Sequence, residues 1–199
     1  MPIDSPDINQ TIREAALRLF AECGFSGTSV RDVASAVGIS PGHLTYHFPK
    51  KSDLFQAAIE TTYRRLVDDL RSLAATPGQP AKRRLRLVLD RLCELAPEES
   101  LMLRTALREL MTAPEHLGPI AKTMQLGHPV VLLGLLQECV AEGSLPSGTG
   151  IGLLPLIMGT LVFAPVMLSI AHAAIGDLGL IEIALNAGRD DLYRLLGLS

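Results

Sequence analysis

The sequence predicts an all-α fold, and three observations support that prediction. Apolar residues recur at spacings of three and four along most of the 199-residue chain, as they do on one face of a helix. No stretch shows the sustained alternation of apolar and polar residues that marks a half-buried strand. Glycine, proline and capping residues such as serine stand where the helical stretches begin and end. We therefore expect helices throughout, in one or two domains.

The first two predicted helices are well delimited. Ser5 is an N-cap followed by Pro6 at the first helical position, and Gly24 is placed to end the helix that they begin. Residues 29–32 have the pattern of a capping box, which starts a second helix. Gly38 follows its last apolar residue and is expected to stop it.

Two further helices follow at once. Ser40 and Pro41 start a short helix that Pro49 ends, and Ser52 is expected to cap a longer helix through Leu73. The residues between the prolines at 77 and 80 form a break.

The rest of the chain predicts five more helices from apolar stripes and breakers. We expect a helix with a core stripe at Leu85, Val88, Leu89, Leu92 and Ala96; a helix between Pro97 and Pro114 that holds Leu103, Ala106, Leu107 and Leu110; one long helix over residues 118–142; and, after a loop at 143–152, two final helices over residues 153–175 and 178–196.

Composition excludes several classes of protein. The chain is 48% hydrophobic and 20% charged, with a formal net charge of −3, so nucleic-acid contact must come from a local patch. The three cysteines lie far apart and form no CxxC pair, which argues against a disulfide framework and a zinc site and favours a reducing, cytoplasmic setting. We see no targeting segment at the N-terminus.

Residues 151–175 carry no charge and are long enough to cross a bilayer. Pro155 and Pro165 interrupt them, and their nearest charged neighbours are acidic Glu142 and Asp177, with no flanking cluster of Lys or Arg. We therefore expect no membrane attachment, and instead a helix buried in a core or in a subunit interface.

Residues 28–48 are the most informative part of the sequence. A short helix, a turn with Gly38 and a second short helix form a helix-turn-helix arrangement. A tight helical hairpin can also be a plain packing unit, but the second helix needs only Leu44 and Phe48 for its core face. Its other side chains are aromatic, imidazole and hydroxyl groups, which are poor for helix stability and suited to phosphates and base edges. The pattern favours DNA binding through this helix.

The chemistry of each position fits that interpretation. Gly42 lets the backbone come close to DNA, and His43 lies at the helix end that points at base edges. Thr45 offers a hydroxyl to phosphate or a methyl group to thymine. Tyr46 and His47 present donors for phosphate oxygens. Further phosphate contacts are expected near helix N-termini, from Thr28, Ser29, Lys50 and Lys51.

An ordered series of segments runs without gaps through residues 8–55: AALRLF at 15–20, GF at 24–25, GTSVRDVA at 27–34, VGISPGHL at 37–44 and YHFPKKSDL at 46–54. This series resembles the TetR/AcrR family of bacterial transcriptional regulators. The rest of the chain resembles the family only in length and helical character.

The resemblance implies a three-helix helix-turn-helix DNA-binding domain at residues 1–50. It implies a C-terminal helical domain at residues 51–199 that binds an effector and forms a homodimer through the last two helices. The expected function is that of a repressor, released from a palindromic operator in double-stranded DNA by a small hydrophobic effector. The small residues Ala184, Ala187 and Gly188 in the last helix are compatible with close packing between subunits.

The resemblance matches five positions to phosphate contacts, namely Thr28, Arg31, Tyr46, His47 and Lys51. It matches Gly42 and His43 to base-proximal positions. Two positions depart from the family pattern: Thr45 stands where Tyr is common, and His43 where Thr or Asn is common. Because both lie on the reading face, the operator sequence does not carry over from a relative. The expected DNA-binding residues are Thr28, Ser29, Arg31, Ser40, Gly42, His43, Thr45, Tyr46, His47 and Lys51.

An apolar effector pocket is also implied, although methionine and phenylalanine at helical spacing more often belong to a core, and a lone histidine on an apolar helix is more often a satisfied core group. The candidate lining residues are Met102, Met124, His128, Phe163 and Met167, with Arg104 and His172 as polar anchors.

Two alternative functions are weaker. The basic run at residues 82–86, with Arg91, could contact nucleic acid, but its leucines and charges lie on opposite faces, which favours a solvated helix face. No G-x-S-x-G, H-E-x-x-H or phosphate-loop motif is present, so we expect neither an enzyme nor a catalytic site, metal site or cofactor.

Overall fold

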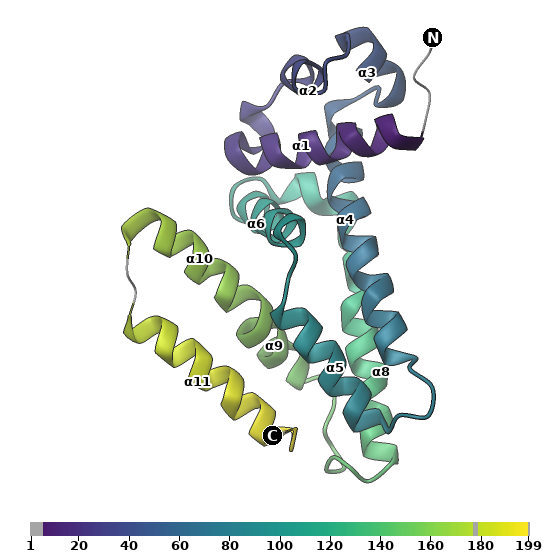
Figure 1. Cartoon of the computed structure of the whole chain (residues 1–199), viewed down its shortest axis with the longest axis vertical. Helices are drawn as coiled ribbons and strands as arrows, with labels where there is room; N and C mark the ends of the chain where they lie inside the picture. Colours follow the sequence, from purple (N-terminus) through teal and green to yellow (C-terminus); the bar gives the residue numbers. More distant parts are fainter. Residues whose placement is uncertain (1–5, 177–178, 199) are drawn as a thin grey trace. The chain divides into compact units, whose positions relative to one another are not determined.

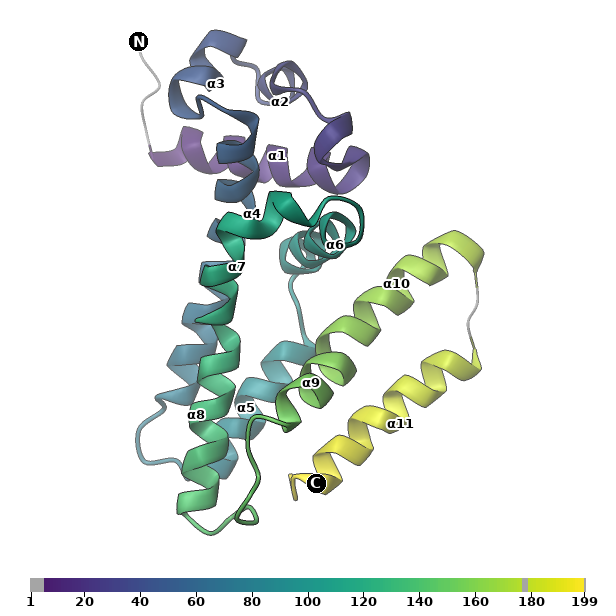
Figure 2. The ribbon, with the colours of Figure 1, turned by 180° about the vertical axis from the view of Figure 1, so that it is seen from behind.

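The computed structural model describes residues 6–176 and 179–198, and every regular element in those residues is helical (Figures 1 and 2). The predicted all-α fold is confirmed. The predicted N-cap residue Ser5 lies outside the described residues. In chain order the elements are α1 (Pro6–Gly27), α2 (Val30–Ala36), α3 (Pro41–His47), α4 (Lys51–Ala74), α5 (Ala81–Cys93), α6 (Pro97–Thr112), the 3-10 helix η1 (Pro114–Leu117), α7 (Gly118–Gln125), α8 (His128–Ala141), α9 (Leu153–Met158), the π-helical turn η2 (Gly159–Phe163), α10 (Ala164–Ile175) and α11 (Leu180–Leu195).

The helices form two compact units. The first comprises Met1–Leu66 and Ala96–Met124, and the second comprises Val67–Leu95 and Gln125–Ser199. These units describe packing, and the domain boundary expected between residues 50 and 51 stays a prediction.

An aromatic cluster lies in the core of the first unit, where α1 packs on α2 and α6. The rings of Phe20 and Phe55 meet edge to face with centroids 5.0 Å apart, and Phe25 lies 5.3 Å from Phe55. Such edge-to-face pairs stabilise a core beyond simple area burial. The cluster joins the end of α1 to the start of α4, the two helices that frame the helix-turn-helix segment.

Two predicted helix ends in this unit need correction. Gly24 does not end α1 but kinks it: its φ of 76° interrupts the helix, which resumes to Gly27. The longer helix α4 begins at Lys51, and the amides of Asp53 and Leu54 donate to the carbonyl of Lys50. Ser52 therefore lies inside the first turn, and its predicted role as the cap was wrong.

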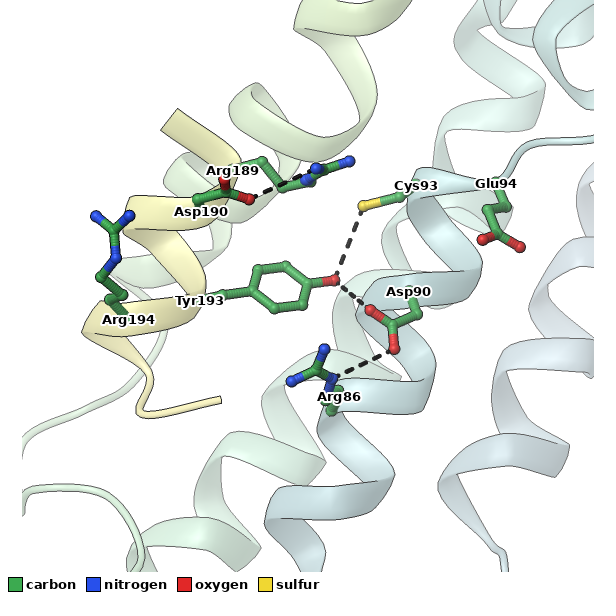
Figure 3. Close-up of a pocket in the computed structure, with 8 residues that line it drawn as sticks. All are labelled: Arg86, Asp90, Cys93, Glu94, Arg189, Asp190, Tyr193 and Arg194. Atoms are coloured by element: carbon green, nitrogen blue, oxygen red, sulfur yellow. Dashed lines mark hydrogen bonds and ion pairs between the residues drawn. The ribbon is translucent and has the colours of Figure 1, made fainter. Parts of the chain in front are cut away.

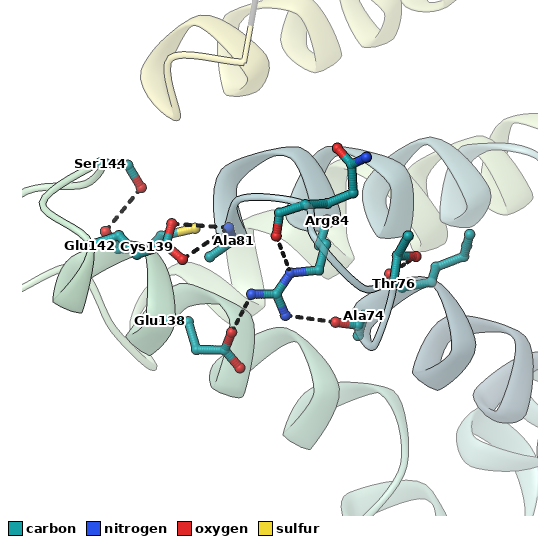
Figure 4. Close-up of polar contacts among 10 residues, drawn as sticks. Ala74, Thr76, Ala81, Arg84, Glu138, Cys139, Glu142 and Ser144 are labelled. Atoms are coloured by element: carbon teal, nitrogen blue, oxygen red, sulfur yellow. Dashed lines mark hydrogen bonds and ion pairs between the residues drawn. The ribbon is translucent and has the colours of Figure 1, made fainter.

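Arg84 joins three segments of the second unit (Figure 4). Its guanidinium donates to the carbonyl oxygens of Ala74 at 2.7 Å and Gln79 at 3.0 Å, and it pairs with the Glu138 carboxylate at 2.6 Å. One helical turn after Glu138, at the C-cap of α8, the carboxylate of Glu142 accepts the backbone N–H of Ala81 at the N-terminus of α5. The loop at the predicted break, residues 75–80, is thus held at both ends.

The core stripe predicted for α5 is confirmed at four positions, since residues 85, 88, 89 and 92 are buried, whereas Ala96 lies beyond the helix. Among the apolar residues that the helix predicted between Pro97 and Pro114 holds, Leu110 of α6 is 57% exposed. The long helix expected over residues 118–142 is two helices, α7 and α8. Its break falls just before Pro129, which can neither donate the next helical hydrogen bond nor avoid the carbonyl four residues earlier.

The two final helices are present, with a π-helical turn in the first. The amide of Ala164 donates to the carbonyl of Gly159, five residues earlier, just before Pro165, which has no amide hydrogen. The last helix starts at Leu180, and the expected start at residue 178 lies outside the described residues. Figures 1 and 2 show α10 and α11 side by side.

Within the described residues, one helical run is long and apolar enough to cross a membrane by length and composition. It spans Leu153–His172, with a mean hydropathy of 2.2. The same length and composition occur in core helices of soluble proteins and in subunit interfaces.

Candidate DNA-binding interface

The helix-turn-helix segment is built by local capping. Ser29 and Asp32 form the predicted capping box at the start of α2: the Asp32 amide donates to Ser29 Oγ at 3.1 Å, and the Ser29 amide donates to Asp32 Oδ2 at 2.8 Å. Hydrogen bonds that the carboxyl of Asp32 makes with the side chain and the backbone of Ser29 lower its pKa. Gly38 has a φ of 72°, so the turn after α2 takes a backbone conformation that disfavours other residues.

The start and core face of α3 are also as predicted. Ser40 Oγ accepts the backbone N–H of His43 at 3.1 Å, with Pro41 at the first helical position. Leu44 is completely buried and Phe48 is half-buried. α3 packs against α2, so its opposite side faces away from the core.

That opposite side carries the polar residues. Tyr46 is 76% exposed, and Gly42 and Thr45 are exposed. His43 and His47 are half-buried neighbours one turn apart, with ring centroids separated by 5.1 Å. The Thr45 hydroxyl donates to the Pro41 carbonyl at 2.8 Å, which leaves its lone pairs and its methyl group for another molecule.

Thr28 points inward. It is 3% exposed, and its hydroxyl lies within hydrogen-bond distance of the carbonyls of Leu19 and Gly24, at 3.1 and 2.9 Å. Because a hydroxyl has a single proton, a phosphate contact from this side chain would require the internal bond to break. Ser29 and Arg31, its neighbours, are exposed.

Lys51 is also engaged internally. Its Nζ donates to the carbonyls of Phe25 at 2.8 Å and Thr28 at 3.0 Å, and lies 4.3 Å from the centroid of the Phe25 ring. An ammonium group has three protons, so one stays available for a phosphate. The first residue of α4 thereby holds the segment between α1 and α2.

Sequence reasoning missed a contact that fixes the same segment from α6. The carboxylate of Glu109, 4% exposed, accepts the backbone N–H of Phe25 at 3.0 Å and lies 2.8 Å from Nδ1 of His116. The His116 ring lies 4.1 Å from the Phe25 ring. Nothing in the local sequence of α6 signals this partner, which is 84 positions away.

The predicted effector-pocket residues are divided between the two units. Three lie in the first unit and four in the second. Burial also differs: Met102 is buried, whereas Arg104 and His172 are exposed, and Phe163 and Met167 are 38% and 44% exposed. None of the seven lines the cavity between α5 and α11, the cavity beside η2, α10 and α11, or the cavity among α1, α4 and α6, so their role as a pocket stays a prediction.

Known proteins resemble the chain both locally and over most of its length. Residues 12–58 match the family model described as bacterial regulatory proteins, tetR family. The HTH-type transcriptional regulator AcrR of Shigella flexneri is 28% identical over 152 residues, which cover 72% of this chain and 69% of AcrR. The HTH-type transcriptional repressor AcnR of Corynebacterium diphtheriae is 29% identical over 150 residues, which cover 67% of this chain and 77% of AcnR.

The fold is shared with solved structures. The transcriptional regulator FadR from Bacillus subtilis, solved in complex with stearoyl-CoA, superposes with a TM-score of 0.73 at 20% identity and covers 95% of this chain and 98% of its own. The matched family segment runs from within α1 to the beginning of α4, and it contains the capped helix-turn-helix and the exposed polar face of α3. Residues 12–58 therefore belong to the TetR family of bacterial regulatory proteins, and most of the chain is similar to HTH-type transcriptional regulators.

Proposed function

We propose that this regulator is a ligand-responsive repressor that binds a near-palindromic operator as a homodimer and leaves it when a small, largely apolar effector binds. The observation that carries the proposal is the two-sided character of α3, in which Leu44 is buried while Tyr46 on the other side is 76% exposed. A helix anchored in this way can enter the major groove of DNA, which is wide enough for an α-helix, with its polar side chains toward the bases. The similarity to a repressor, AcnR, supports the direction of the response.

As a member of this family, the protein is a soluble cytoplasmic DNA-binding protein and not an enzyme. The apolar run Leu153–His172 is therefore assigned to packing between protein segments and not to a lipid bilayer.

The proposed DNA contacts divide into two kinds. Gly42, His43 and Thr45 read base edges from the N-terminal half of α3. Phosphates are held by exposed groups at the N-termini of α2 and α3, within α2 and just before α4, together with the end of α3. Those residues are Ser29, Arg31, Ser40, Tyr46, His47 and Lys50. Thr28 and Lys51 position the segment between α1 and α2, as their internal hydrogen bonds support.

We further propose that residues 1–50 form the DNA-binding domain and residues 51–199 the effector and dimerisation domain. The last two helices expose apolar side chains that a monomer would leave in water. They are Phe163, Met167, Ile181, Ile183 and Leu195. A second copy of the chain that covers this face by a two-fold axis would set two α3 helices on one near-palindromic site.

Selection from a random pool of duplexes tests the DNA-binding part. We expect the enriched sequences to contain two inverted half-sites, with affinity that falls steeply as salt concentration rises. A Tyr46→Ala variant should lose affinity, whereas Arg83→Ala, which removes an exposed charge on α5, should not. Affinity that is absent for every duplex, or insensitive to salt, would contradict the proposal.

Sedimentation equilibrium tests the dimer. The parent protein should be dimeric at micromolar concentration, and Ile183→Asp should shift it to monomer because a charge would be buried in the interface. Val130→Asp, which places the same charge on an exposed valine of α8, is the matched control and should stay dimeric. A monomeric parent, or equal effects of both variants, would contradict the proposed interface.

A further inference from the structure

A polar cavity of about 500 Å³ lies between α5 and α11 in the second unit (Figure 3). Tyr193 reaches from α11 toward α5, where its hydroxyl donates to Asp90 Oδ1 at 2.8 Å and lies 3.8 Å from Cys93 Sγ. The residues that line this cavity are Arg86, Asp90, Cys93, Glu94, Arg189, Asp190, Tyr193 and Arg194.

A second, smaller cavity of about 200 Å³ adjoins the first. Cys93 and Arg189 line both, so the two cavities meet at these side chains. The remaining lining of the smaller cavity is mostly apolar and comes from η2, α10 and α11: Thr160, Leu161, Pro165, Leu168, Leu185 and Asn186. An apolar compartment thus opens beside a compartment lined by three arginines and three carboxylates.

The arginines have donors to spare. Arg86 pairs with Asp90 at 3.6 Å and Arg189 with Asp190 at 3.5 Å, distances that leave most of the five N–H groups of each guanidinium uncommitted. Arg86 also donates to the Leu198 carbonyl, but both arginine side chains are 47% exposed and within reach of a ligand from solvent. Guanidinium groups in this arrangement favour carboxylate and phosphate oxygens.

The acidic groups of the larger cavity are partly satisfied by the protein. Asp90 accepts the Tyr193 hydroxyl and faces Arg86, and Asp190 faces Arg189. Burial, reinforced by the hydrogen bond to Asp90, raises the pKa of the Tyr193 phenol, which therefore stays neutral and acts as a donor. Because the one phenol proton is donated to Asp90, the donors that remain for an incoming anion are the N–H groups of the arginines.

We propose that these two cavities form one binding site for an amphipathic monoanion, in which Arg189 and Arg86 hold a carboxylate and the smaller cavity holds a short alkyl or aryl group. A cavity of about 150 Å³ suffices for benzene, so the smaller compartment accommodates a group of one ring or a short chain. The site is distinct from the residues expected to bind an effector from the sequence. That this ligand is the effector which releases DNA rests on the proposed function, whereas its binding does not.

Calorimetric titration with octanoate tests the site, with three probes as controls: acetate lacks the chain, octanol lacks the charge and octylamine reverses it. Octanoate should bind more tightly than all three. Arg189→Gln should weaken octanoate binding about tenfold, the cost of losing charge-assisted hydrogen bonds. Arg83 is an exposed arginine of α5 that lines neither cavity, so Arg83→Gln should leave octanoate binding unchanged.

The cysteines locate the bound probe. Cys93 is half-buried at the junction of the cavities, whereas Cys23 is exposed in the first unit. Octanoate should slow alkylation of Cys93 by N-ethylmaleimide, followed by mass spectrometry of peptides, and leave Cys23 unaffected. Binding that is absent, equal for octylamine, insensitive to Arg189→Gln or without protection of Cys93 would overturn the proposal.

DNA affinity measured with and without octanoate separates the two proposals. Octanoate that binds as described and also lowers operator affinity supports both. Octanoate that binds without changing operator affinity supports the site and contradicts its role as effector. A chain that binds no duplex contradicts the proposed function, while calorimetry still decides whether the anion site exists.

Discussion

The carboxylate of Glu109 accepts the backbone N–H of Phe25 at 3.0 Å, although 84 positions separate the two residues. Phe25 follows the kink of α1 at Gly24 and precedes α2, so this bond ties α6 to the entry of the helix-turn-helix segment. Lys51 holds the carbonyl of the same residue from the start of α4. The backbone of Phe25 is therefore fixed through its N–H by α6 and through its carbonyl by α4.

Removing the carboxylate should destabilise the first unit. We expect Glu109→Ala to lower the free energy of unfolding by about 1–3 kcal/mol, because it leaves a buried N–H without an acceptor. Glu109→Gln should cost less, since its amide oxygen still accepts. Urea denaturation followed by circular dichroism measures both, with Glu115→Ala, an exposed carboxylate in η1, as the control. Equal losses for the alanine and glutamine variants would contradict the role of the acceptor.

Base reading by α3 predicts a particular effect of His43→Ala. The variant should lose about 1–3 kcal/mol of preference for the selected operator over random duplex, with random-duplex affinity unchanged. Lys50→Ala, which removes an exposed charge beside α3, should weaken both equally and lower the slope of log affinity against log salt by about 0.9. Fluorescence anisotropy titrations at several salt concentrations measure both. The same loss on operator and random DNA for His43→Ala would exclude base reading.

The contacts of Arg84 predict a stability effect in the second unit. Arg84→Met keeps most of the side-chain volume but removes its hydrogen bonds to two backbone carbonyls and to Glu138, and should lower the free energy of unfolding by about 2 kcal/mol. Arg83→Met, at an exposed neighbouring position, should change it by less than about 0.5 kcal/mol. Thermal and urea denaturation measure the difference. Similar values for the two variants would show that the hydrogen bonds of Arg84 contribute nothing to the free energy of unfolding.

His128 predicts how stability depends on pH. Burial lowers the pKa of this imidazole from 6.5 to about 4, so the folded protein keeps it neutral where the unfolded chain binds a proton. The contribution of His128 to the free energy of unfolding should be constant above pH 6.5. It should fall by up to about 3 kcal/mol as the pH drops toward 4. His128→Gln should flatten this part of the profile, and His172→Gln, an exposed histidine, should not. Urea denaturation between pH 4 and 8 measures the slopes, and a parent profile that rises toward acid would contradict the assignment.

The sequence was most informative where structure is set by nearest neighbours. The capping box of Ser29 and Asp32, the positive φ of Gly38 and the cap at Ser40 are local events, and each was predicted from its own few residues. The core side of α3 was predicted in the same way, because a short helix with Leu44 as its buried residue can face the core in only one orientation.

Contacts between distant segments were not predictable in this way. Thr28 reads as an exposed residue beside a helix start, yet the fold turns its hydroxyl toward Leu19 and Gly24. The cavity beside Tyr193 combines α5 with α11, about a hundred positions later, and no spacing within either helix reveals the other. The break between α7 and α8 is different, because it is a local event: Pro129 near the start of α8 outweighs an apolar stripe that continues across it.

The high exposure of Tyr46 has an optical consequence. The chain has three tyrosines and no tryptophan, and the other two phenols are buried, one in each unit. Tyrosine fluorescence can therefore be followed on addition of a duplex without a tryptophan signal. Nitration under mild conditions should modify the exposed ring of Tyr46 first. The protein thus carries an intrinsic spectroscopic reporter on the helix proposed to contact DNA.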